Sequence, residues 1–339
     1  YEIQASDWSS DVCSSDLGFI KFNGAYDHGC FRYINWGNGC GNVFTYFPVR
    51  FGCLMLDLLT TSPLFAGGLI FVLGLCIGSF LNVVIYRLPV MMQRQWDNEC
   101  CNLNNQTPKH TDKFNLATPA SRCPHCGHKI RAWENIPVLS WLLLLKGKCS
   151  NCKAPISLRY PLVELATGIL SLIIFMVFGP TFKMLTALVL TWALIALTMI
   201  DFDTQLLPDD ITLPLVWLGL LVNINGLWIP LEQAVIGAMC GYLSLWSIYW
   251  LFKLVTGKEG MGYGDFKLLA AFGAWIGPSQ LPLIILLSSV VGAVIGGAYA
   301  IIRKQSAPFA FGPYLAIAGL IAVFGGSEIV DWYLGTWKH

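Results

Sequence analysis

Long apolar segments alternate with short polar ones along most of the chain. The run Leu64–Tyr86 holds 23 residues without a charge, and Asp57 and Arg87 flank it. A helix needs about 20 apolar residues to cross the hydrocarbon core of a bilayer. The pattern predicts an all-α polytopic membrane protein with about eight transmembrane helices. The other apolar segments, two of them short or glycine-rich, are 161–179, 184–200, 211–229, 234–252, 266–277, 281–302 and 311–325.

A polar stretch, 87–159, separates the first predicted helix from the second and is rich in lysine and arginine. The short loops that would lie on the same side of the membrane carry Lys253, Lys258, Arg303 and Lys304. Basic residues concentrate in cytoplasmic loops. We therefore expect this stretch to be a cytoplasmic loop domain, after a first transmembrane segment at 55–86 and before a membrane domain at 160–339.

Residues 1–54 differ from the rest of the chain. They contain no apolar run long enough to span a bilayer, and the segment Asp7–Leu17 looks like a translated sequencing-library adapter. It lacks the basic and apolar regions of a secretory signal. We interpret 1–54 as a non-native extension ahead of a start at Met55; the alternative is a genuine periplasmic or variable extension.

The composition agrees with a membrane protein. Hydrophobic residues make up 55% of the chain, charged residues 12%, and the mean hydropathy is +0.59. Soluble domains are about 45–50% apolar and about 25% charged. This excludes a disordered chain, a coiled coil and an ordinary soluble enzyme. The net charge of +1 gives no long-range attraction to nucleic acid, so we expect a lipid bilayer and no nucleic acid as partner.

Two pairs of cysteines lie in the polar stretch, and 22 residues separate them. The pairs are Cys123-Pro-His-Cys126 and Cys149-Ser-Asn-Cys152. Two such pairs can hold one tetrahedral zinc ion, and four thiolates would leave no position for water. The spacing predicts a structural zinc ion in a zinc-ribbon-like loop. Two disulfides are the alternative, although a reducing cytoplasm disfavours them; His125 and His128 are possible substitute ligands.

Aspartates stand at the ends of two predicted helices. Asp201 and Asp203 end the third helix, and Asp265 opens the sixth after Gly262-Tyr-Gly264. Ionisable groups in or beside membrane helices are candidates for function. Asp201 and Asp265 would lie at the same side of the membrane, where two carboxylates can polarise a water molecule. An aspartate in the first turn of a helix also has a purely structural use, because it complements the helix dipole.

These residues resemble a known family, the bacterial type IV prepilin peptidases, which are membrane aspartyl proteases with a Gly-x-Gly-Asp motif. The resemblance extends from Met55 to the last predicted helix. It rests on the two aspartate motifs, the paired cysteines, the first-helix motif Gly78–Pro89 and the late motif Pro308–Pro313.

The resemblance implies a bifunctional enzyme of the bacterial inner membrane. It would cleave the leader of prepilins and pseudopilins after a glycine at the cytoplasmic face, and then methylate the new N-terminal amine with S-adenosylmethionine. The family's catalytic pair corresponds to Asp201 and Asp265, and its methylation-linked residues to Gly147 and Lys148. Supporting residues would be Gly262, Gly264 and Asp203, with Asp209 and Asp210 close enough to assist.

Three other interpretations stay open. A peptidase without methyltransferase activity would keep both aspartates. A carboxylate-dependent membrane transporter would use the same aspartates, but the sequence shows no paired broken helices of the kind that transporters have. A non-enzymatic part of a pilus or secretion machine would need neither carboxylate. The sequence contains no glycine-rich methyltransferase motif, so it gives no location for the methyl donor.

Overall fold

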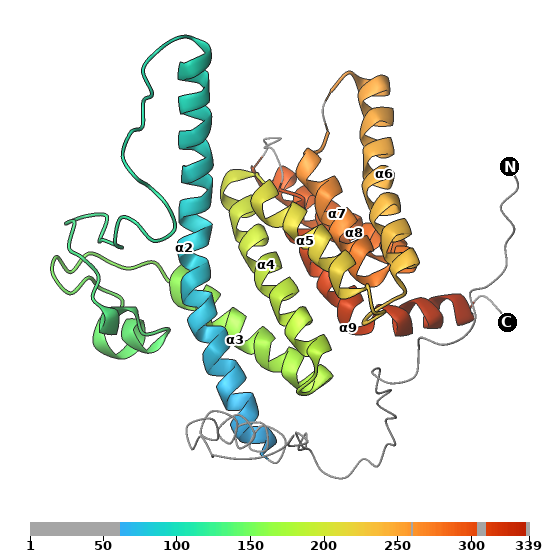
Figure 1. Ribbon diagram of the computed structural model, residues 1–339, viewed down its shortest axis with the longest axis horizontal. Helices are drawn as coiled ribbons and strands as arrows, with labels where there is room; N and C mark the ends of the chain where they lie inside the picture. Colours follow the sequence, from blue (N-terminus) through green and yellow to red (C-terminus); the bar gives the residue numbers. More distant parts are fainter. Residues whose placement is uncertain (1–61, 259, 304–309, 337–339) are drawn as a thin grey trace, which may run out of the picture. The chain divides into compact units, whose positions relative to one another are not determined.

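The computed structural model describes residues 62–339, apart from 259, 304–309 and 337–339. The segment interpreted as a non-native extension, 1–54, lies outside the described residues. Within the described part the protein is all-helical, with two isolated β-bridges in the loop domain, which confirms the predicted fold class (Figure 1). The α-helices are α2 (Pro63–Leu103), α3 (Arg159–Phe178), α4 (Phe182–Thr204), α5 (Asp209–Val222), α6 (Leu231–Thr256), α7 (Tyr263–Ile276), α8 (Leu281–Arg303) and α9 (Gly312–Thr336).

Each predicted apolar segment corresponds to one of these helices, but they differ in length. Five helical segments of the described residues are long and apolar enough to cross a membrane: α2, α3, α4, α6 and Pro278–Ala298, which includes most of α8. α5 and α7 have 14 residues each, about 21 Å at 1.5 Å per residue, against a hydrocarbon core of about 30 Å. In α9 the backbone leaves helical geometry at Gly325. The protein is therefore multi-pass, while the count of eight spans stays a prediction.

The short helix α7 lies at the centre of the main hydrophobic core. Its residues from Leu268 to Ile276 are all buried. α6 approaches it at backbone distance, because a Cβ on Gly273 would stand only 2.0 Å from the carbonyl oxygen of Gly237. The Asn223 amide donates to the carbonyls of Ala274 and Trp275, at 2.9 and 3.1 Å, and so satisfies the end of the helix. α7 is apolar because protein surrounds it, and it does not need the length of a lipid-facing span.

The longest helix is α2, which continues 17 residues past Tyr86 to Leu103 (Figure 1). Its membrane part packs on α3 through glycines: a Cβ on Gly78 would stand 2.7 Å from the Cα of Glu164. Pro89 is accommodated inside the helix. The sequence predicted a loop from Arg87 onward. The structure corrects that boundary, because the first part of the polar stretch is helical.

The rest of the polar stretch is irregular, with two short helices, η2 (Ala132–Asn135) and η3 (Ser140–Leu144). Arg87 is buried and donates to the backbone carbonyls of Asn115, Leu116 and Pro119 at 2.6–3.3 Å. The backbone N–H of Val138 donates to Glu164 on α3 at 2.8 Å. The loop domain is thus fixed at both sides to the helices that flank it. A third short helix, η4 (Pro278–Gln280), precedes α8.

Candidate active site and metal centre

Asp201 and Asp265 line one cavity of about 650 Å³. Asp201 lies in the last turn of α4 and Asp265 in the first turn of α7. Their exposed fractions are only 5% and 6%. The cavity therefore brings together two buried carboxylates from separate helices. Such a pair can hold a water molecule and move protons in both directions.

A glycine that the sequence did not single out positions one of these carboxylates. The backbone N–H of Gly312, at the start of α9, donates to Oδ2 of Asp201 at 2.9 Å. A Cβ on Gly312 would stand 2.6 Å from the same oxygen. Only glycine lets the chain approach the carboxylate this closely. Gly312 belongs to the motif Pro308–Pro313, but nothing in one sequence indicates its contact with Asp201.

The two glycines before Asp265 differ in their surroundings. Gly264 packs closely against Leu207, in the connection between α4 and α5, because a Cβ on Gly264 would stand 2.6 Å from the Cβ of Leu207. Gly262 precedes the helix and has more space, because a Cβ there would come no closer than 3.8 Å to its nearest neighbour, Oδ2 of Asp265. Both line the cavity. Gly264 supports the site through close packing, and Gly262 keeps the cavity wall free of a side chain.

Two of the other aspartates, Asp203 and Asp209, are engaged in ion pairs. Asp203 is not among the residues lining the cavity; it pairs with Arg159 of α3, with N–O distances of 2.7 and 2.6 Å. Asp209 does line it, and accepts from Lys267 at 2.6 and 2.7 Å. Asp210 lines it as well. The structure thus separates Asp203 from the pair Asp201 and Asp265.

One wall of the cavity comes from the part of α2 that the sequence assigned to a loop. Met92, Gln95, Trp96 and Glu99 line it. Their spacing of three, four and seven residues is the spacing of one helical face. That signal was present in the sequence and was missed because the polar composition indicated a loop.

The four cysteines of the loop domain form one group. Their sulfur atoms all lie within 4.8 Å of one another, with 3.8 Å between Cys123 and Cys152 and 4.0 Å between Cys126 and Cys149. Thiolates about 2.3 Å from a tetrahedral zinc ion stand about 3.8 Å apart. All four cysteines are free. The group can therefore hold a metal ion, and neither His125 nor His128 belongs to it.

The two cysteine pairs have the same local geometry. In each, the residue after the second cysteine is left-handed, with φ of +69° at Gly127 and +60° at Lys153. Backbone N–H groups turn toward the sulfur atoms. Those of Cys152 and Asn151 lower the pKa of Cys149 to about 6, and that of His128 lowers the pKa of Cys126. At Cys149 and Cys126 these bonds favour the thiolate, which is the form that binds metal.

Gly147 and Lys148 form the turn that leads into the second cysteine pair. Gly147 has φ of +71°, and a Cβ there would stand 3.1 Å from the Trp141 ring. Lys148 is exposed, and its backbone pairs with Pro155. Neither residue lines the cavity that holds the aspartates. The residues expected to serve methylation and those expected to serve cleavage therefore belong to different sites.

The fold and these two sites define a polytopic helical membrane protein with a pair of buried carboxylates and a four-cysteine loop domain. Residues 72–178 match the family model described as Bacterial Peptidase A24 N-terminal domain, and residues 188–297 match the one described as Type IV leader peptidase family. The chain belongs to the type IV leader peptidase family.

Relatives named Prepilin leader peptidase/N-methyltransferase are similar over nearly their whole length. One from Aeromonas salmonicida (strain A449) is 56% identical over 288 residues, which is 84% of this chain and 99% of the relative. One from Stutzerimonas stutzeri is 57% identical over 282 residues, 82% of this chain and 97% of the relative. One from Pseudomonas aeruginosa is 54% identical over 283 residues, which is 83% of this chain and 97% of the relative. No solved structure matches the chain.

Proposed function

We propose that this protein removes the leader of type IV prepilins and pseudopilins and then methylates the new N-terminal amine. The observation that carries the peptidase half is the single cavity lined by Asp201 and Asp265, both buried and from different helices. The methyltransferase half rests on the names of the relatives and on the Gly147-Lys148 turn beside the cysteine group.

The two aspartates would act as an acid–base pair. One carboxylate takes a proton from a water molecule held between them, and the resulting hydroxide adds to the carbonyl carbon of the scissile peptide bond. The other, protonated, carboxyl group donates its proton to the leaving amine nitrogen as the C–N bond breaks. Gly312 holds Asp201 in one orientation through its N–H group. Gly264 lets Leu207 pack beside the start of α7.

The cysteine group would hold a zinc ion. Cys123, Cys126, Cys149 and Cys152 supply four sulfur ligands at tetrahedral spacing, so the ion would have a structural role. The binding energy of such an ion contributes directly to folding of the segment that holds it. Here that segment includes the turn at Gly147 and Lys148, which the ion would keep in place for methyl transfer from S-adenosylmethionine.

The basic loop domain would face the cytoplasm from the bacterial inner membrane. The substrate's apolar segment would lie among the membrane helices, with its leader junction at the cavity. Labelling of a cysteine introduced at an exposed loop position such as Lys113 tests this orientation. Ready labelling from outside intact cells would show that the loop domain faces away from the cytoplasm.

Mass spectrometry of a prepilin incubated with the purified protein and S-adenosylmethionine tests both activities at once. We expect loss of the leader and a gain of one methyl group on the shortened chain. Cleavage without methylation would leave a peptidase alone, and an intact prepilin would overturn the proposal.

A further inference from the structure

The part of α2 beyond the membrane has two opposite faces with different surroundings. Successive helical residues are about 100° apart, so positions 92, 95, 96 and 99 point one way and positions 93, 94, 97 and 98 point about 180° away from them. The first set lines the cavity that holds Asp201 and Asp265. Three residues of the second set, Arg94, Asp97 and Asn98, make polar contacts with the segment that follows the helix.

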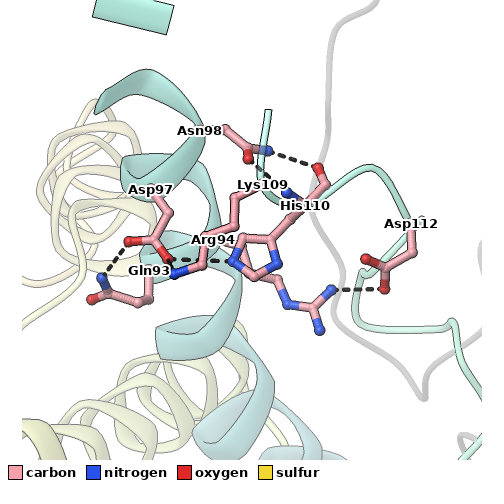
Figure 2. A network of polar contacts seen from close by, with 7 residues as sticks. All are labelled: Gln93, Arg94, Asp97, Asn98, Lys109, His110 and Asp112. Atoms are coloured by element: carbon pink, nitrogen blue, oxygen red, sulfur yellow. Dashed lines mark hydrogen bonds and ion pairs between the residues drawn. The ribbon is translucent and has the colours of Figure 1, made fainter. Parts of the chain in front are cut away.

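Those contacts form a brace, shown in Figure 2, between α2 and residues 109–112. Asn98 pairs twice with the backbone of His110, donating to its carbonyl and accepting from its N–H, both at 2.9 Å. Asp97 lies 3.3 Å from His110 Nε2 and accepts from Gln93 at 3.0 Å (Figure 2). Arg94 pairs with Asp112 at 2.8 Å, and this lowers the pKa of the Asp112 carboxyl group.

The brace has a consequence for the opposite face. A helix end that projects from a bundle frays unless other groups hold it. Here the backbone of His110 and the side chain of Asp112 hold one side of the projection, so the other side keeps a fixed position at the cavity. The protein thus builds a rigid wall here from residues that belong to the N-terminal family segment.

The side chains of this wall combine an aromatic and apolar surface with a carboxylate. Trp96 is 42% exposed and Met92 lies one turn away on the same face. Gln95 donates to the carboxylate of Glu99 at 2.9 Å and so fixes its position. An indole with a carboxylate one turn further on suits a lysine or arginine side chain, whose hydrocarbon stem packs on the ring while its charged end reaches the carboxylate.

The rest of the cavity strengthens the preference for positive charge. Asp201, Asp209, Asp210 and Asp265 line it together with Glu99. Among the described residues that line the cavity, the basic side chain is that of Lys267, and it already pairs with Asp209. A cationic side chain entering from outside would therefore meet an excess of carboxylates.

We propose that Trp96 and Glu99 bind a lysine or arginine in the leader of the polypeptide that is cleaved, and so determine substrate specificity. This rests on the peptidase function proposed above. The wall meets the leader and not the apolar segment, because Met92 lies six residues past Tyr86, about 9 Å of helix beyond the predicted span. A polypeptide at that level is in a polar environment.

The test measures cleavage kinetics of the purified full-length protein with Trp96→Ala and Glu99→Gln. The substrates are prepilins whose leader carries one lysine at successive positions, the other basic residues being glutamine. For the lysine position nearest the wall, we expect each variant to raise KM about three- to tenfold with kcat nearly unchanged, as a contact of about 1 kcal/mol would. For an all-glutamine leader, Glu99→Gln should have no effect.

Matched controls separate binding from folding. Trp217→Ala on α5 and Glu232→Gln at the start of α6 remove the same groups from exposed positions that do not line the cavity, and should leave KM unchanged. Trp96→Phe should restore most of the affinity. Methylation of an already cleaved pilin reports folding, and should continue in all variants.

The outcomes are distinct. An unchanged KM for every lysine position in both variants overturns the proposal while the peptidase function stands, and so does a fall in kcat that is the same for lysine and glutamine leaders. If Trp96→Ala stops methylation as well, its effect is structural and Glu99→Gln alone decides. A wild-type protein that cleaves no prepilin overturns the peptidase function itself.

Discussion

The cavity and the cysteine group are built in opposite ways. The cavity draws its carboxylates from α4 and α7, separated by 64 residues of sequence, and places them at 5% and 6% exposure. The cysteine group takes its ligands from two tight turns 22 residues apart, in a segment with little regular structure. The first therefore depends on packing of the whole helical domain, and the second on local turns that a metal ion can hold together. A change at one should leave the other largely intact.

The largest effect is expected from Asp201→Asn and Asp265→Asn. Each removes one half of the acid–base pair, so prepilin cleavage on a gel should fall by about 10³-fold or more. Asparagine nearly matches aspartate in volume, and methylation of an already cleaved pilin should persist. The double variant should be no worse than either single one, because the two groups act as a unit.

Asp203→Asn is the control for this pair. Its carboxylate contacts Arg159 and does not line the cavity, and a partly exposed ion pair contributes at most about 1 kcal/mol. Cleavage should therefore remain close to the wild-type rate. Normal cleavage by well-folded Asp265→Asn would show that the acid–base pair lies elsewhere, with Asp209 and Asp210 next to be examined.

The second effect concerns the metal. Loss of a residue that merely supports a ligand costs about 10–100-fold in metal affinity, so loss of the ligand in Cys149→Ser should cost at least that. Metal analysis should show less than one zinc per chain, and methyl transfer should fall about in proportion, while most cleavage is retained. Cys101→Ser, outside the group, is the control. Full activity of both kinds in a metal-free sample would refute the zinc site.

The third effect is the displacement of one carboxylate. In Gly312→Ala the new Cβ would stand 2.6 Å from Oδ2 of Asp201, so the carboxylate must move. Misplacement by about 1 Å can cost about 100-fold in rate, and we expect cleavage to fall at least tenfold with methylation unchanged. Gly68→Ala on α2 meets no atom within 4 Å and serves as the control. An unaltered rate would mean that the contact with Asp201 has no part in cleavage.

The smallest effect is expected from Lys148→Ala. The side chain is exposed, and an exposed charge contributes little interaction energy. Its removal should therefore lower methyl transfer only several-fold, without changing cleavage. Arg122→Ala is the matched control, since Arg122 precedes the first cysteine pair as Lys148 precedes the second, and both make the same type of backbone bridge. Equal loss of both activities in the Lys148 variant would indicate that the loop has unfolded.

Local features were readable from the sequence, and contacts between distant segments were not. The apolar segments and the two cysteine pairs follow from spacing alone, and the structure places them as predicted. The burial of α7 within the protein could not be inferred from the sequence, because a short helix in lipid and one in a protein core have the same apolar composition. The contact between Gly312 and Asp201 joins residues 111 positions apart. The wall of α2 was readable from its helical spacing, but its polar side chains suggested a loop.

The unbroken course of α2 also bears on how such proteins diversify. Most of α2 belongs to the N-terminal family segment, and four of its residues line the cavity together with the carboxylates of the other segment, so the two segments are not independent modules. A recombination event that exchanged only the first hundred residues between relatives would bring a new cavity wall along with them. Preference for a particular leader could thus be inherited with the half of the gene that carries neither aspartate.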